Sequence, residues 1–197
     1  MKFDSLLEYV NQLETHLSLV SKHASNLVKR NKDSANALLE FGSSITVLGQ
    51  SEGESLGSGL QHMGNTVDQI SKFSSGAAEE EQWQLDAPIQ EYVRILGNVK
   101  AAIARRGEKK AAHLQAIIDL EAKQASYSKS LSSGKEAQIA QKQAEVEKAQ
   151  MLVDSSQSEF ETVSEKLLVE FERFKREKAS DIKAILLNYV SIQVLYS

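Results

Sequence analysis

The chain has 197 residues with one proline, no cysteine and 10 glycines, which excludes a disulfide scaffold or a cysteine-based zinc module and argues against a domain rich in β-turns. Its formal net charge of −4, from 23 basic and 27 acidic residues, argues against a generic nucleic-acid binder. With 41% hydrophobic and 25% charged residues and few helix breakers, the sequence favours a single all-α domain over residues 1–197.

The first predicted helix covers residues 3–48. Fourteen positions at spacings of three and four form a seam over this segment, and twelve of them are apolar, which is typical of a long helix packed on partner helices. The two polar members, Asn31 and Ser34, are interpreted as a register-setting contact or a slight kink. The candidate core or dimer contacts are Phe3, Leu6, Val10, Leu13, Leu17 and Val20, together with Tyr189 and Ile192 near the other end of the chain.

Glycine and serine dominate the next segment, with six glycines between residues 49 and 76. Because each glycine costs a helix roughly 1 kcal/mol relative to alanine, the pattern predicts an interruption over 49–57 and a turn at 74–76. Between them lies an additional, shorter helix over 58–75, with Leu60, Met63, Val67 and Ile70 on its apolar side.

Two long helices are predicted in the rest of the chain, over 79–131 and 135–195. Pro88 falls in the opening turns of the first of them, where a missing N–H does least harm. The second contains neither glycine nor proline, and at 1.5 Å per residue its sixty or so residues would extend for roughly 90 Å. We therefore expect an elongated bundle of three long antiparallel helices whose apolar surface is completed by a second copy.

The sequence offers no chemistry typical of an enzyme. His16 and His23 lie seven residues apart on one helix, and no Glu-x-x-His pair or His-Glu-x-x-His motif accompanies them. We expect no catalytic activity, no metal site and no cofactor. The longest uncharged run, 184–197, is shorter than the roughly 18 residues of a membrane span, and no signal peptide is recognised, so a cytoplasmic protein is expected.

Charge is strongly segregated along the chain. Between residues 51 and 91 eight acidic residues stand against one basic residue, whereas between 97 and 135 eight basic residues stand against three acidic ones. Such a basic stretch on a long helix suits an anionic membrane surface, to which each Lys or Arg contributes about 1 kcal/mol. A solvated face that keeps the bundle soluble explains the same pattern equally well.

Three stretches resemble the BAR domain of the sorting nexins, the endosomal proteins associated with retromer. The segment Leu38–Gly49, with Phe41, Ile45 and Leu48, resembles the end of the first helix of that domain. The segment 92–102 resembles the start of its second helix, and 171–189 resembles its third. Each motif alone is weakly specific, but their order and spacing cover essentially the whole chain.

The resemblance implies a crescent-shaped coiled-coil dimer, formed with itself or with a related sorting nexin, that senses or induces membrane curvature in endosomal sorting and retrograde transport. It implies a peripheral location on endosomal membranes, retromer as a partner and no nucleic acid. Sorting nexins also carry a PX domain, which a chain with one proline is not expected to contain. The residues expected to contact the membrane are Arg105, Arg106, Lys109, Lys110, Lys123, Lys129 and Lys135.

Two alternatives stay open beside this hypothesis. The chain would in one case be a helical scaffold that binds protein partners through its acidic face and does not itself bind lipid. In the other it would be a dimerisation module of a longer protein whose membrane contacts lie elsewhere.

Overall fold

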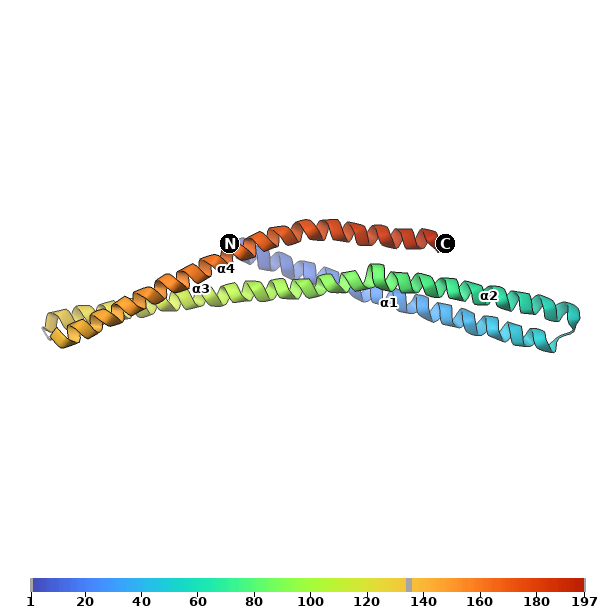
Figure 1. Ribbon diagram of the computed structural model, residues 1–197, viewed down its shortest axis with the longest axis horizontal. Helices are drawn as coiled ribbons and strands as arrows, with labels where there is room; N and C mark the ends of the chain where they lie inside the picture. Colours follow the sequence, from blue (N-terminus) through green and yellow to red (C-terminus); the bar gives the residue numbers. More distant parts are fainter. Residues whose placement is uncertain (1, 134–135, 197) are drawn as a thin grey trace. The chain divides into compact units, whose positions relative to one another are not determined.

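The structure, a computed structural model, describes residues 2–133 and 136–196 (Figure 1). Its elements in chain order are α1 (Lys2–Ser51), α2 (Glu54–Glu81), the π-helix η1 (Gln82–Asp86), α3 (Ala87–Ser133) and α4 (Glu136–Leu195). The described residues contain no strand. Because α2, η1 and α3 follow one another without a break, the chain forms three long helical stretches, which confirms the predicted all-α class.

The glycine-rich segment is more helical than predicted. Only Glu52 and Gly53 separate α1 from α2, and residues 74–76, where a turn was expected, lie inside α2. The additional helix predicted over 58–75 is therefore the first part of the second long stretch. The reason lies in the packing of the glycines, because those at positions 42, 49, 57 and 64 lie on the buried side of their helices.

Contacts between residues divide the chain into two compact units. Unit 1 comprises Met1–Leu7 and Asn98–Arg176, and unit 2 comprises Glu8–Gly97 and Glu177–Ser197. Unit 1 is mainly a hairpin of the later part of α3 and the first part of α4. Its core contains Ala116, Leu120 and Val153, with Ile117 and Val146 packed against them.

Unit 2 contains the hairpin of α1 and α2 (Figure 1). The closest contacts between these two helices are made by residues with small side chains. On α2 four of the five buried positions recur every seven residues, and small residues on α1 recur at the same interval. We call this set the small-residue stripe: Ala35, Gly42 and Gly49 on α1, and Gly57, Gly64, Ser71 and Ala78 on α2. The Ser71 hydroxyl donates a hydrogen bond of 2.7 Å to the carbonyl oxygen of Ala35, so the two backbones approach closely.

The close approach divides the predicted apolar side of α2. The Cβ atoms of Leu60 and Val67 lie beside Gly49 and Gly42 of α1, and both side chains are half-buried. Met63 and Ile70 are each 49% exposed. Only part of the predicted apolar side therefore packs against α1.

The π-helix η1 is explained by the single proline. Pro88 has no N–H, and its ring would clash with the carbonyl of Gln84 in a regular α-helix. In the structure the N–H of Ala87 reaches five residues back to the carbonyl of Gln82, so the helix widens just before the proline. The sequence had placed Pro88 in the opening turns of a helix. Because α2 and η1 continue directly into α3, the proline instead lies inside a continuous helical stretch.

Two buried carboxylates, Glu81 and Asp86, lie at the two ends of this widened segment. Glu81 is 1% exposed and accepts hydrogen bonds from Asn31 Nδ2 at 2.6 Å and from Gln193 Nε2 at 2.7 Å. Asn31 therefore makes the polar contact predicted for it, and this contact joins α1 to α2. Ser34, the other polar member of the seam, is exposed.

Candidate functional site

The six basic candidates that the structure describes all lie in unit 1, on α3. They do not form one uniform surface. Arg105, Lys110 and Lys129 are exposed, whereas three others are engaged in contacts within the hairpin. The remaining candidate, Lys135, lies outside the described residues.

Arg106 is a packing residue. Its guanidinium carbon lies 3.4 Å from the centre of the Phe3 ring and 4.9 Å from that of Phe160, and its Nε donates a hydrogen bond of 2.9 Å to Ser164. Cation–π contacts of this kind contribute roughly 0.5–2 kcal/mol, and more as the cation is desolvated. The half-buried Arg106 therefore ties the first turn of α1 to α3 and α4 within unit 1.

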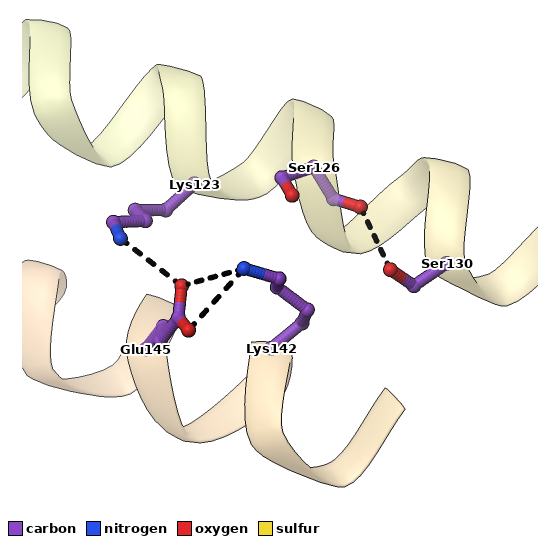
Figure 2. Close-up of polar contacts among 5 residues, drawn as sticks. All are labelled: Lys123, Ser126, Ser130, Lys142 and Glu145. Atoms are coloured by element: carbon purple, nitrogen blue, oxygen red, sulfur yellow. Dashed lines mark hydrogen bonds and ion pairs between the residues drawn. The ribbon is translucent and has the colours of Figure 1, made fainter. Parts of the chain in front are cut away.

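Lys109 and Lys123 each pair with a carboxylate on α4. Lys109 Nζ lies 2.5 Å from Glu159 Oε2, and Lys123 Nζ lies 3.0 Å from Glu145 Oε2. Figure 2 shows the Glu145 carboxylate between Lys123 and Lys142. Lys142 Nζ also lies 3.0 Å from Glu145 Oε2. The bonds from Lys142 and Lys123 lower the pKa of Glu145, and the bond from Lys109 lowers the pKa of Glu159.

These pairs explain part of the charge segregation. In unit 1 the described part of α3 carries seven basic and three acidic residues, whereas the facing part of α4 carries six basic and nine acidic residues. The two sides of the hairpin are thus complementary in charge. A basic stretch that looked like a membrane surface in the sequence is used in part to pair α3 with α4.

Three of the eight predicted core or dimer contacts are buried within the chain itself. Leu6, Val10 and Ile192 are buried, and the structure buries the others only in part or leaves them exposed. The half-buried members are Phe3, Leu13, Leu17 and Tyr189, and Val20 is exposed. Of these eight residues, Val20 has the largest exposed fraction and so the most surface left for a second chain.

A larger set of exposed apolar side chains lies on the α1–α2 hairpin of unit 2. Five of them lie one residue before a member of the small-residue stripe and so share one side of their helix, and we call these the outer apolar face: Phe41 and Leu48 on α1, and Leu56, Met63 and Ile70 on α2. Leu39, Val47 and Phe73 are exposed at other positions around the two helices. The sequence seam included two of these residues, Phe41 and Leu48. The seven-residue spacing of the glycines marks the positions at which α1 and α2 contact each other. This spacing could have separated the residues of the contact from the exposed apolar residues.

No site for a metal ion is formed by the described residues, since nowhere among them do three or more His, Asp or Glu side chains gather. Within the same ranges no helix is long and apolar enough to cross a bilayer.

The chain is similar to known proteins along nearly its whole length. The family model described as "Vps5 C terminal like" matches residues 3–195. The chain is 28% identical over 182 residues to sorting nexin 1 of Arabidopsis thaliana, covering 91% of this chain and 44% of that protein. It is 25% identical over 189 residues to sorting nexin-1 of Mus musculus, covering 95% of this chain and 36% of the mouse protein. The chain thus spans less than half the length of these relatives.

Among solved structures, the N-terminal I-BAR domain of IBARa from D. discoideum matches with a TM-score of 0.48 and 15% identity, covering 98% of this chain and 82% of that one. The Imp2 F-BAR domain matches with a TM-score of 0.42 and 14% identity, covering 94% and 72%. The sequence relatives are sorting nexins, which confirms the resemblance predicted from the motifs.

Proposed function

Because the chain belongs to the Vps5 C-terminal-like family, we propose that it is the BAR-type module of a sorting nexin, dimeric and bound peripherally to anionic endosomal membranes. In this role it senses or induces membrane curvature during endosomal sorting and retrograde transport. Its dimer forms with a second copy or with a related sorting nexin, and retromer is a partner of the whole protein.

The observation that carries membrane binding is the exposure of Arg105, Lys110 and Lys129 on α3. Their charges face solvent, whereas Arg106, Lys109 and Lys123 are held by partners within unit 1. A cation near an acidic leaflet contributes about 1 kcal/mol, so three of them together favour binding by about 3 kcal/mol. The three exposed cations are therefore the residues on which electrostatic binding would depend.

Co-sedimentation with vesicles that contain phosphatidylserine tests this proposal. Reversing Arg105, Lys110 and Lys129 to glutamate is expected to weaken binding by about 100-fold or more. A matched variant reverses three exposed cations of unit 2, Lys22, Lys29 and Arg30, and is expected to bind normally. Binding that is insensitive to the first variant, or that persists unchanged at 1 M salt, contradicts an electrostatic membrane contact.

The outer apolar face supports dimerisation. Five large apolar side chains that share one side of their helices and are each about half exposed are a surface typical of protein contacts. Light scattering is expected to give twice the 21.8 kDa mass of one chain. Met63→Glu with Ile70→Glu is expected to give the single-chain mass, whereas Met151→Glu with Leu152→Glu, at exposed apolar positions of unit 1, leaves it doubled. A single-chain mass for the unaltered protein contradicts the proposal.

A second candidate is a helical dimerisation or interaction scaffold that does not itself bind lipid. It is favoured by the acidity of unit 2, which has fourteen acidic and eight basic residues, and by the internal pairing of half of the described basic candidates. A doubled mass without any binding to acidic vesicles would favour this candidate.

A further inference from the structure

The π-helix turns the only tryptophan of the chain toward solvent. Trp83 lies in η1 and is 73% exposed, whereas Leu85 and Asp86, two consecutive residues of the same segment, are both buried. A large aromatic side chain contributes strongly when a partner covers it, and π-helices occur frequently at functional sites. Trp83 is therefore not part of the buried core, and it lies in unit 2, outside the basic surface of unit 1 that is proposed to bind a membrane.

Asp86 holds η1 in place from inside unit 2. Its Oδ1 accepts hydrogen bonds from Ser25 Oγ at 2.6 Å and from Gln90 Nε2 at 2.9 Å, and its Oδ2 accepts one from Gln82 Nε2 at 3.0 Å. Three bonds to a carboxylate that is 3% exposed anchor the widened turn to α1 and α3. The backbone that carries Trp83 is thus fixed before any partner arrives, which lowers the entropy cost of binding.

A groove of about 510 Å³ opens beside Trp83, between the start of α3 and the end of α4 in unit 2. Its floor is apolar, with Pro88, Ile95 and Ile185 among the lining residues. Two carboxylates, Glu91 and Asp181, also line it, and no Lys, Arg or His belongs to the part of the lining that the structure describes. We call this cavity the Trp83 groove.

Both carboxylates have polar neighbours. Asp181 accepts a hydrogen bond from the hydroxyl of Tyr92, whose pKa is raised by burial and by that bond, so the phenol stays neutral and remains a donor. Glu91 is paired with Arg94 of its own helix at 2.5 Å, and the Arg94 side chain is 75% exposed. Water screens such an exposed pair, so an incoming cation competes with it readily.

We propose that the Trp83 groove binds an arginine-rich segment of a protein partner that also carries aliphatic side chains. Arginine fits this lining best, because its planar guanidinium stacks on an aromatic face and pairs with carboxylates. The aliphatic side chains pack against the apolar floor. The fourteen acidic and eight basic residues of unit 2 favour a cationic partner over an anionic membrane.

Since Trp83 is the only tryptophan, its emission reports on this groove alone. The full chain is titrated with a short synthetic peptide of alternating leucine and arginine, and in parallel with the same peptide carrying glutamate for arginine. The expected result is a saturable blue shift of Trp83 emission with the arginine peptide and no shift with the glutamate peptide.

Matched variants separate a specific site from general charge attraction. Glu91→Gln with Asp181→Asn removes both groove carboxylates and is expected to weaken peptide binding about tenfold. Asp33→Asn with Glu40→Gln removes two exposed carboxylates of α1 and is expected to leave the affinity within twofold. Trp83→Ala, followed by anisotropy of a labelled peptide, is expected to weaken binding about fivefold. Circular dichroism establishes that every variant remains helical.

Three results would overturn the proposal. The first is an equal loss of affinity in the two carboxylate variants, or an unresponsive Trp83. The second is a halved mass of the Trp83→Ala variant in light scattering, since a second copy would then cover the groove. The third is a blue shift of Trp83 emission with phosphatidylserine vesicles in place of the peptide. None of these results depends on Arg105, Lys110 or Lys129, so the membrane proposal stands or falls separately.

Discussion

Replacing Gly64 by alanine adds one methyl group at the centre of the small-residue stripe. An added Cβ would lie 2.7 Å from the carbonyl oxygen of Gly42 and 2.1 Å from Thr46 Oγ1. The threonine side chain can rotate away, but the carbonyl belongs to the backbone of α1. To restore an ordinary contact of 3.4 Å, α1 and α2 must therefore separate locally by about 0.7 Å.

Two opposing free energies decide the effect of this substitution. Alanine is favoured over glycine inside a helix by about 1 kcal/mol. Overpacking a close contact costs about 1–3 kcal/mol, and a rigid carbonyl as the obstacle puts the cost in the upper part of that range. The expected net loss of stability is about 1–2 kcal/mol, which for a chain of this length lowers the Tm by roughly 2–8 °C.

Thermal unfolding followed by far-ultraviolet circular dichroism, at one protein concentration, measures this loss. Gly59→Ala is the matched control, because Gly59 lies in the same helix and an added Cβ there has nothing within 4 Å. The control is expected to raise the Tm by roughly 2–4 °C through helix propensity alone. If Gly64→Ala stabilises the chain as much as Gly59→Ala does, the close approach of α1 and α2 is refuted.

Three further substitutions test contacts in the two units. Tyr92→Phe removes the hydrogen bond to Asp181 and is expected to lower the free energy of unfolding in urea by about 1 kcal/mol. Because folding raises the pKa of Tyr92, the unaltered protein should also lose stability as the pH rises above about 10. Glu145→Gln removes a carboxyl whose pKa is lowered by folding, so it is expected to flatten the loss of stability that the unaltered protein shows as the pH falls below about 4. Arg106→Met is expected to cost about 1 kcal/mol and to speed amide exchange around Phe3, and Arg106→Lys should restore little of it.

Each of these expectations has a clear contrary outcome. Alkaline stability that is the same with and without the Tyr92 hydroxyl would mean that its bond to Asp181 does not persist in solution. Parallel acid profiles for Glu145→Gln and the unaltered chain would mean that its two lysine pairs are not maintained. Full recovery by Arg106→Lys would mean that a point charge suffices and that stacking on Phe3 is unimportant.

The helical class and the long helices could be predicted because periodicity and the scarcity of proline act along the local chain. The glycines were harder to interpret, because propensity alone treats each one as a cost. What makes Gly57 and Gly64 favourable in α2 is the backbone of α1, which lies far away in sequence. For the same reason the predicted apolar side of α2 is only half correct: Leu60 and Val67 lie beside glycines of α1, whereas Met63 and Ile70 stay exposed.

The candidate site was predictable only as a region. Composition locates an excess of cations on α3, but it does not tell which of them meet a carboxylate on α4. Lys109 is held by Glu159, fifty residues away, while its neighbour Lys110 is exposed. The π-helix could be traced afterwards to Pro88, yet the sequence alone is also compatible with a helix that begins at the proline.

The small-residue stripe also has a consequence for the heat capacity of unfolding. This quantity, like the denaturant m-value, rises with the apolar surface that unfolding exposes. A hairpin that buries glycine, alanine and serine while Phe41 and Phe73 remain half exposed gains little such surface when it melts as a single chain. If a partner covers the outer apolar face, unfolding exposes this apolar surface as well. Calorimetry at rising protein concentration would then show the heat capacity change of unfolding and the cooperativity of melting increase together.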